Sequence, residues 1–256
     1  MSWERNIHLK NAAELKIMRE AGRINAAVLE AVRERIQPGV TTLELDETAE
    51  AVLGRHGCTS PFKNYGRPPF PASITVSVNE ELVHGIPSRK RKLREGDIVS
   101  VDCGTVLDGF VGDSAFTAGV GRISPRAKEL LEITQGALRA GIEKMRAGLR
   151  TGDVSAAIQE YVESRGYHVT REYTGHGVGR QMHEGPQVPN YGTPGTGPLL
   201  KPGMTIALEP MVLVGTAETR VLADQWTVVS ADGSLTAHFE HSVAVTDGEP
   251  VILTEL

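Results

Sequence analysis

The chain has 256 residues, of which 40% are hydrophobic and 23% are charged, and its formal net charge at pH 7 is −5. This composition is typical of a folded globular protein and excludes a disordered chain, while the acidic balance excludes a specific nucleic-acid binder. No stretch approaches the ~20 apolar residues of a membrane span, and the start MSWERNIHLK lacks the apolar core of a signal peptide. We therefore expect a cytoplasmic protein without a membrane partner, and we take it to act as a monomer.

Two further features are interpreted as structural. Cys58 and Cys103 are too few for a disulfide framework and lack the CxxC spacing of a zinc or redox motif, so both are expected to be reduced. The short basic run 89–94 is expected to form a solvated loop.

An internal repeat sets the expected order of helices. Sliding the sequence by 109 residues places Gly39 on Gly148 and Gly57 on Gly166, with apolar residues at three- and four-residue steps around them. Each half is therefore predicted to contain a helix, a glycine turn, a second helix and a glycine stop. Ser124-Pro125, an N-cap followed by proline at the first helical position, marks the start of a helix.

Similar strands follow the helices in both halves. Segments 93–102 and 200–209, offset by 107 residues, each read as a turn, a strand and a carboxylate. We expect an α+β domain covering 1–256, in which duplicated halves, about 12–120 and 121–250, share one sheet with helices on one face. Chance alignment of two helix–strand stretches is the alternative to a repeat.

The sequence Asp108-Gly109 is a strong signal for a two-residue hairpin loop. Counting from this loop, residue 104 faces Asp113, so Asp102 lies diagonally from Asp113 on the same sheet face, about 7–8 Å away at the backbone. Singly, Asp102 could end a strand and Asp113 could belong to a turn. Two like charges in a half-buried sheet need neutralising, usually by cations, although a glycosidase-type acid pair is an alternative.

Two histidines lie in the segment 173–191, which contains too many glycines for a helix. They therefore cannot form the helical pair of an HExxH motif. His176 is flanked by glycines, which implies close backbone approach, and is a candidate metal ligand. His183 is suited to hydrogen bonding with a substrate at neutral pH.

Two glutamates complete the candidate site. Glu209 ends the strand 205–208 and precedes a proline, while Glu240 lies in an alternating strand over 236–245, opposite to the face of Phe239 and His241. Four carboxylates and one imidazole suit a pair of Mn²⁺, Fe²⁺ or Co²⁺ ions, with Zn²⁺ possible. Two such ions can share a hydroxide for hydrolysis.

The sequence resembles the type I methionine aminopeptidases, which have the pita-bread fold of a curved antiparallel sheet and pseudo-twofold halves. The most specific motif is 173–191, with His176, His183 and the closing Val-Pro-Asn-Tyr in the family's order and spacing. Segments 79–87, 208–211 and 239–242 also occur in that order. The similarity extends over nearly the whole chain.

The resemblance implies roles for individual residues. Five of them would bind two divalent ions (Co, Mn, Fe or Zn): Asp102, Asp113, His176, Glu209 and Glu240. Glu240 would bridge the ions, and Glu209 would also shuttle the proton. His84 would contact the scissile nitrogen, and His183 would steady the carbonyl oxygen as charge develops.

The resemblance also implies a substrate, the initiator methionine of nascent polypeptides whose second residue is small. Its pocket would be lined by Phe70, Trp226, Met182 and, as a weaker candidate, Tyr65; Thr75 stands where some relatives carry cysteine. A monovalent cation near Asn79 and transient proximity to the ribosome are further expectations.

The short prokaryotic-like form of the family fits best. The chain starts almost directly at the catalytic domain, and only 31 residues separate Glu209 from Glu240, which leaves no room for the helical insertion of the type II enzymes. An Xaa-Pro aminopeptidase or prolidase would share the five ligands but usually carries a further amino-terminal domain. A binding protein with inactive chemistry on the same scaffold is the alternative from another class.

Overall fold

The computed structural model describes residues 7–256, so residues 1–6, part of the start examined for a signal peptide, lie outside the described residues. Its helices are α1 (Ala12–Arg35), α2 (Thr42–Arg55), α3 (Pro125–Ile142) and α4 (Thr151–Glu163). Over the described range, no helix combines the length and apolar character needed to cross a bilayer. Both cysteines are buried and free, as expected.

Side-chain caps mark the starts of three helices, and the start predicted at Ser124-Pro125 is confirmed. The side chains of Asn11, Thr41 and Ser124 accept hydrogen bonds from first-turn N–H groups of α1, α2 and α3, which satisfies donors that a helix leaves unpaired. The turns between the paired helices contain Gly39 and Gly148, with φ of 93° and 90°, a conformation that favours glycine. The same turn geometry thus recurs 109 residues later.

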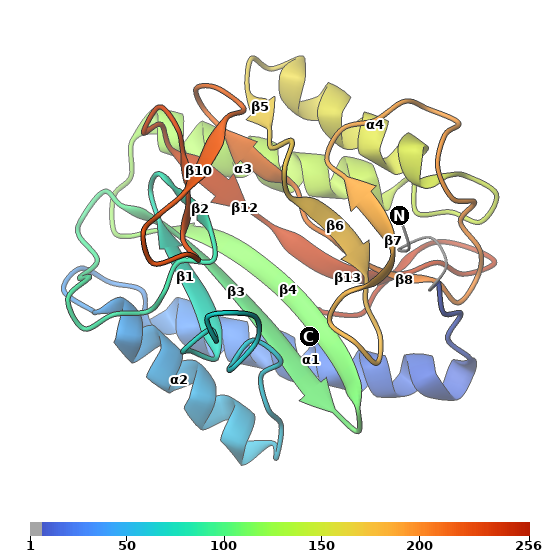
Figure 1. Cartoon of the computed structure of the whole chain (residues 1–256), viewed down its shortest axis with the longest axis horizontal. Coiled ribbons are helices and arrows are strands. Elements are labelled where there is room, and N and C mark those ends of the chain that lie inside the picture. The colour runs from blue at the N-terminus through green and yellow to red at the C-terminus, as the bar shows by residue number, and fades with distance from the viewer. Residues whose placement is uncertain (1–6) are drawn as a thin grey trace.

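A large antiparallel sheet carries both halves of the chain. Its strands run in the order β1 (Ile74–Val78), β3 (Ile98–Leu107), β4 (Phe110–Gly119), β13 (Glu240–Ala244), β8 (Thr205–Leu208), β6 (Thr174–Gly177) and β7 (Glu184–Pro189), and β14 (Val251–Ile252) pairs with β13. Helices α1 and α2 contact β1, β3 and β4, whereas α3 and α4 contact strands of the second half (Figure 1). The predicted α+β class is confirmed.

Two small sheets flank the large one. They contain β10 (Thr219–Val221), β11 (Val228–Ser230) and β2 (Glu81–Val83) in one, and β12 (Thr236–His238), β9 (Met211–Leu213) and β5 (His168–Val169) in the other.

The expectation of one continuous strand over 236–245 is wrong. The segment is split at Phe239 into β12 and β13, which lie in different sheets. The preceding crossing, from β8 to β9, occurs at Glu209-Pro210, and the Phe239 N–H bonds to the Pro210 carbonyl at 3.4 Å. Because proline has no N–H, an uninterrupted ladder cannot form here. Both segments change sheets side by side, beside the two glutamates of the candidate site.

A buried ion pair joins the amino-terminal segment to the first residue of β7. The Lys10 ammonium lies 2.6 Å from the Glu184 carboxylate, and both side chains are 4% exposed. The same carboxylate accepts the N–H groups of Arg180 and Gln181 at 2.8 and 3.2 Å. Glu184 therefore fixes the turn that ends at His183.

Replacing Lys10 by Met is expected to lower the free energy of unfolding by about 3–5 kcal/mol, because it leaves a buried carboxylate without its counter-charge. The matched control is Lys63→Met, which breaks an exposed pair with Glu50 and should cost less than about 1 kcal/mol. Urea unfolding midpoints measure both. Equal losses in the two variants would contradict the importance of the buried pair.

Candidate metal centre and active site

The hairpin register places the two aspartates as the sequence predicts. Leu107 pairs with Phe110 and Gly104 with Asp113, so Asp102 lies diagonally from Asp113 on the same face. The loop residue Asp108 has φ of 47°, in the left-handed region that Asp tolerates in such turns. Asp108 is therefore part of the turn and not of the site.

The glutamates extend the same row across the sheet. Asp102 pairs with Ala115, and Ala115 pairs on its other side with Glu240. His241 pairs with Leu208, so Glu209, the residue that follows β8, lies opposite Glu240. Because directly paired residues share a face, three carboxylates from three segments point to one side.

A second row, two residues further along the strands, adds the aspartate and the histidine. His176 pairs with Ala207, which pairs with Ser242. The Ser242 hydroxyl lies between the N–H and the carbonyl of Asp113, at 3.0 and 2.9 Å. Antiparallel register alone therefore brings His176 and Asp113 to the face that holds the first row.

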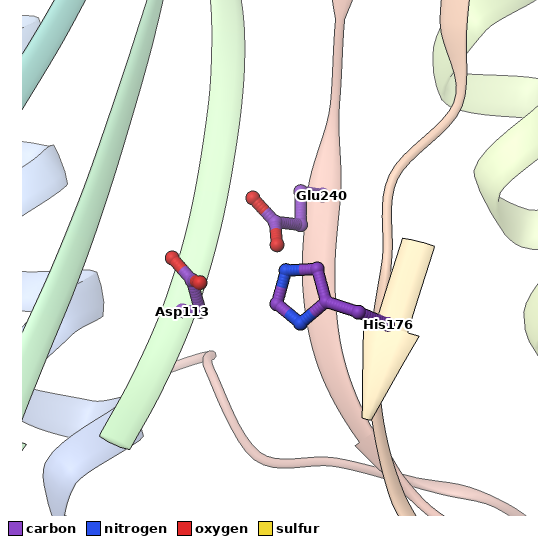
Figure 2. A group of neighbouring side chains, drawn as sticks. All are labelled: Asp113, His176 and Glu240. Carbon is purple, nitrogen blue, oxygen red and sulfur yellow. The ribbon is translucent and has the colours of Figure 1, made fainter. Parts of the chain in front are cut away.

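Three of these side chains form a compact set of donors. One ligand atom from each of Asp113, His176 and Glu240 lies within 4.8 Å of the others, and Figure 2 shows the three side chains converging from β4, β6 and β13. The Glu209 carboxylate is 3.5 Å from His176 Nε2. The five residues that the sequence proposes as metal ligands are therefore neighbours.

Burial dominates the electrostatics of the carboxylates. It raises the pKa of Asp113 to about 7. Burial, followed by repulsion from neighbouring carboxylates, also raises the pKa values of Asp102, Glu209 and Glu240 well above their ordinary range. Burial and, after it, the proximity of the acids to one another thus disfavour their charged forms.

The imidazole of His176 is neutral and oriented in a way that suits a metal ligand. Burial lowers its pKa to about 3, so the ring is neutral at pH 7 and its 3.5 Å contact with Glu209 is not an ion pair. Its Nδ1 lies 3.0 Å from the Gly177 carbonyl, to which an N–H at Nδ1 donates. Nε2 then presents its lone pair to the carboxylates.

The residues present fit divalent cations. One oxygen of Asp102 and one of Asp113 are buried without any hydrogen-bond partner. Buried unpaired polar atoms are unfavourable unless something neutralises them. Oxygen donors with one neutral imidazole are the ligand types that suit such ions.

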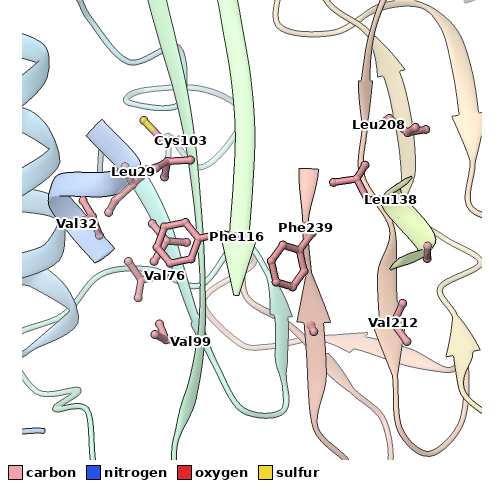
Figure 3. Packing of buried hydrophobic residues seen from close by; sticks show 14 of the residues in the cluster. Leu29, Val32, Val76, Val99, Cys103, Phe116, Leu138, Leu208, Val212 and Phe239 are labelled. Atoms are coloured by element: carbon pink, nitrogen blue, oxygen red, sulfur yellow. The ribbon is translucent and has the colours of Figure 1, made fainter. Parts of the chain in front are cut away.

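The opposite face of the hairpin packs into the hydrophobic core. Val99 and Cys103 of β3 belong to the same buried cluster as Leu29 and Val32 of α1, on the side of the sheet that faces this helix (Figure 3). Strand alternation therefore assigns odd-numbered positions of β3 to the core and Asp102 to the site. Helix α1 covers the face of the hairpin opposite to the acids, so the acidic face lines the cavity.

A cavity of about 180 Å³ covers the acidic face. It is lined by all eleven residues that the sequence proposes for the site: Tyr65, Phe70, His84, Asp102, Asp113, His176, Met182, His183, Glu209, Trp226 and Glu240. Phe70 packs edge-on against Trp226 with ring centroids 5.2 Å apart, and Met182 and Phe62 join this apolar cluster. The cavity thus has an acidic floor and an apolar wall.

Two further imidazoles line the cavity. Burial and the neighbouring His183 lower the pKa of His84 to about 4, and its ring packs edge-on against Tyr173 at 5.8 Å. Burial also lowers the pKa of His183, whose Nδ1 lies 2.9 Å from the Tyr65 hydroxyl. Both rings are neutral at pH 7, so each can donate one hydrogen bond and accept another.

One histidine of the site escaped the sequence reasoning. His238 is 2% exposed, and its Nε2 lies 3.5 Å from Glu209 and 3.9 Å from Glu240. The signal was available, because His238 precedes Glu240 by two residues and alternation puts both on one face. Thr75, which pairs with Asp102, also lines the cavity.

Comparison with known proteins agrees with this geometry. The model of metallopeptidase family M24 matches residues 16–247. A methionine aminopeptidase of Clostridium acetobutylicum is 50% identical over 248 residues, covering 97% of this chain and 98% of the relative.

Solved structures show the same architecture. A crystal structure of methionine aminopeptidase from Thermotoga maritima has a TM-score of 0.95 and 45% identity, and the match covers 98% of this chain and 100% of that one. An Xaa-Pro dipeptidase from Bacillus anthracis has a TM-score of 0.78 and 27% identity, but only 62% of its chain is covered, against 97% of this one. The expected pita-bread fold is confirmed, and the chain belongs to metallopeptidase family M24, within which it groups with the methionine aminopeptidases.

Proposed function

We propose that this protein removes the amino-terminal methionine from polypeptides whose second residue is small. The observation that carries the proposal is the cavity, in which an acidic floor suited to metal lies directly beneath an apolar wall of Phe70, Met182 and Trp226. An unbranched thioether side chain fits such a wall, because aromatic edges and sulfur attract each other. The methionine aminopeptidases among its relatives support this substrate.

The proposed cofactor is a pair of divalent ions, with Co, Mn, Fe or Zn as candidates. Five residues would hold the ions: Asp102, Asp113, His176, Glu209 and Glu240. When bound, such ions supply Lewis-acid polarisation and an activated water. A monovalent cation near Asn79 is a separate proposal; the Asn79 carbonyl already accepts hydrogen bonds from the N–H and the hydroxyl of Thr236.

The protein's own residues divide the remaining work. Glu209 would take the proton from the attacking water and pass it to the leaving nitrogen, a role that suits a carboxylate whose pKa is raised by burial. His84 would hydrogen-bond the scissile nitrogen, and His183 would donate to the carbonyl oxygen as negative charge develops. Nascent polypeptides near the ribosome, in the cytoplasm, would be the natural substrates.

Peptide release tests the proposed substrate. Chelator-stripped protein resupplied with Mn²⁺, Fe²⁺ or Co²⁺ is expected to release the first residue of Met-Ala-Ser, but not of Met-Leu-Ser or Ala-Pro-Ser, measured by chromatography of the products. Preference for Ala-Pro-Ser would favour an Xaa-Pro peptidase instead. No release with any ion would support a binding protein on this scaffold.

The raised pKa values predict how the stripped protein responds to pH. The buried carboxylates hold protons more tightly in the folded than in the unfolded chain, so their contribution to stability should fall as pH rises from about 4, their ordinary range, through the pKa of Asp113 at about 7. The buried histidines, whose pKa values are lowered, act in the opposite direction below their ordinary pKa of 6.5. Melting temperatures of the unmodified protein and of Asp113→Asn at pH 5 and pH 8 isolate the loss due to the carboxylate, and Mn²⁺ should offset it at pH 8.

Two variants of the same hairpin separate the site from general charge effects. Asp113→Asn removes one acid from the cluster and should flatten the pH dependence. Asp108→Asn changes only the turn and should keep the slope of the unmodified protein. The same pH slope in Asp113→Asn as in the unmodified protein would show that the raised pKa of Asp113 does not contribute to stability.

Replacing His183 by Ala is expected to lower kcat by roughly 10²–10³ and leave the metal content unchanged, because the ring would stabilise the developing oxyanion without binding metal. Metal analysis by mass spectrometry and peptide kinetics measure the two effects separately. His56→Ala, at the exposed end of α2, is the control. Loss of metal in the His183 variant would instead make this residue a ligand.

A further inference from the structure

Two loops that are distant in sequence meet at the edge of the cavity through Tyr65 and His183. The Tyr65 hydroxyl lies 2.9 Å from Nδ1 of His183, and the ring centroids are 5.6 Å apart. From the sequence, Tyr65 is only a weaker candidate for the lining of the methionine pocket. Because its hydroxyl contacts the His183 ring, for which a catalytic role is proposed, Tyr65 can influence the reaction as well as line the pocket.

The backbone of the Tyr65 loop is held firmly although the side chain is 44% exposed. The Tyr65 N–H donates to the Phe62 carbonyl at 2.9 Å, and the Tyr65 carbonyl accepts the Phe70 N–H at 2.8 Å. The Asn64 N–H also donates to the Phe70 carbonyl at 2.8 Å. The loop is therefore cross-bonded on both sides of Tyr65, and the position of the hydroxyl is set before a substrate arrives.

The position of His183, the other partner, is also fixed by its surroundings. The turn that leads to His183 is tied by the Glu184 carboxylate, which accepts two backbone N–H groups and the Lys10 ammonium. On its other side the His183 ring packs edge-on against His176, with centroids 4.3 Å apart. Rotation of the His183 ring would disturb both contacts.

The direction of the hydrogen bond decides which nitrogen of His183 carries the proton. A neutral imidazole has one donor and one acceptor nitrogen. A phenol hydroxyl is a strong donor, and the lone pair of an imidazole nitrogen is a better acceptor than a phenol oxygen. Donation from Tyr65 to Nδ1 therefore leaves the proton of His183 on Nε2.

We propose that Tyr65 is a positioning residue that holds His183 in the tautomer with its proton on Nε2, so that His183 can donate to the carbonyl oxygen of the substrate. The inference rests on the proposed function, which assigns that donation to His183. A donor already aimed at the place where charge develops needs no reorganisation during the reaction. The opposite tautomer would present a lone pair to the oxygen and repel it.

Tyr65→Phe removes only the hydroxyl and keeps the ring in the apolar wall. Release of methionine from Met-Ala-Ser by the metal-loaded variant is expected to show kcat lowered about five- to tenfold, with KM changed less than about twofold and metal content unchanged. Tyr191→Phe is the matched control, since Tyr191 lies outside the cavity and contacts Arg171. An unchanged kcat in Tyr65→Phe would overturn the proposal.

Nitrogen NMR tests the tautomer independently of activity. Protein labelled with ¹⁵N-histidine and loaded with diamagnetic Zn²⁺ is compared with Tyr65→Phe, and His183→Gln identifies the signals of His183 by their loss. We expect a protonated Nε2 and an unprotonated Nδ1 in the unmodified protein, and a mixture of tautomers in Tyr65→Phe. A proton on Nδ1 in the unmodified protein, or the same single tautomer in both, would overturn the proposal.

The outcomes distinguish this inference from the proposed function. If the unmodified protein releases methionine and Tyr65→Phe is equally active, only the role of Tyr65 fails. If the unmodified protein releases no methionine with any ion, the proposed function fails, and the role of Tyr65 with it, whatever tautomer the NMR spectra show.

Discussion

Four carboxylates on one face of a buried sheet are the constraint on which the rest of the structure depends. Asp102, Asp113, Glu209 and Glu240 repel one another in surroundings that disfavour their charge, as their raised pKa values express. A fold keeps such an arrangement only if it is rigid and if cations can neutralise it. Antiparallel pairing of β3, β4, β13 and β8, supported by helices on the opposite face, provides that rigidity.

The imidazoles around the acids are neutral rather than positively charged. Burial lowers the pKa values of His176, His84 and His183, so these rings are neutral at pH 7 and do not form ion pairs with the carboxylates. Neutral rings leave the carboxyl oxygens of the floor available to metal and can still exchange single hydrogen bonds with a substrate. Which nitrogen donates then depends on neighbours such as the Gly177 carbonyl and the Tyr65 hydroxyl.

The change of sheets beside Glu209 connects the fold to the site. Two neighbouring segments change sheets, one at Glu209-Pro210 and one at Phe239. The first crossing contains Glu209, and the second lies next to Glu240. A regular ladder would have continued the strands and filled this position with paired backbone. The interruption instead opens the face to the cavity, where His238 also lies.

The sequence by itself determined what depends on local geometry. A two-residue loop fixes its own register, so Asp108-Gly109 was enough to separate Asp102 and Asp113 from the turn, and helix caps such as Ser124 fixed the helix starts. Residue patterns indicated the five candidate ligands, and sequence resemblance indicated their roles and the family. Only the tertiary structure decided the split at Phe239 and the contact of Tyr65 with His183. These depend on pairings between segments far apart in the chain, which no local pattern encodes.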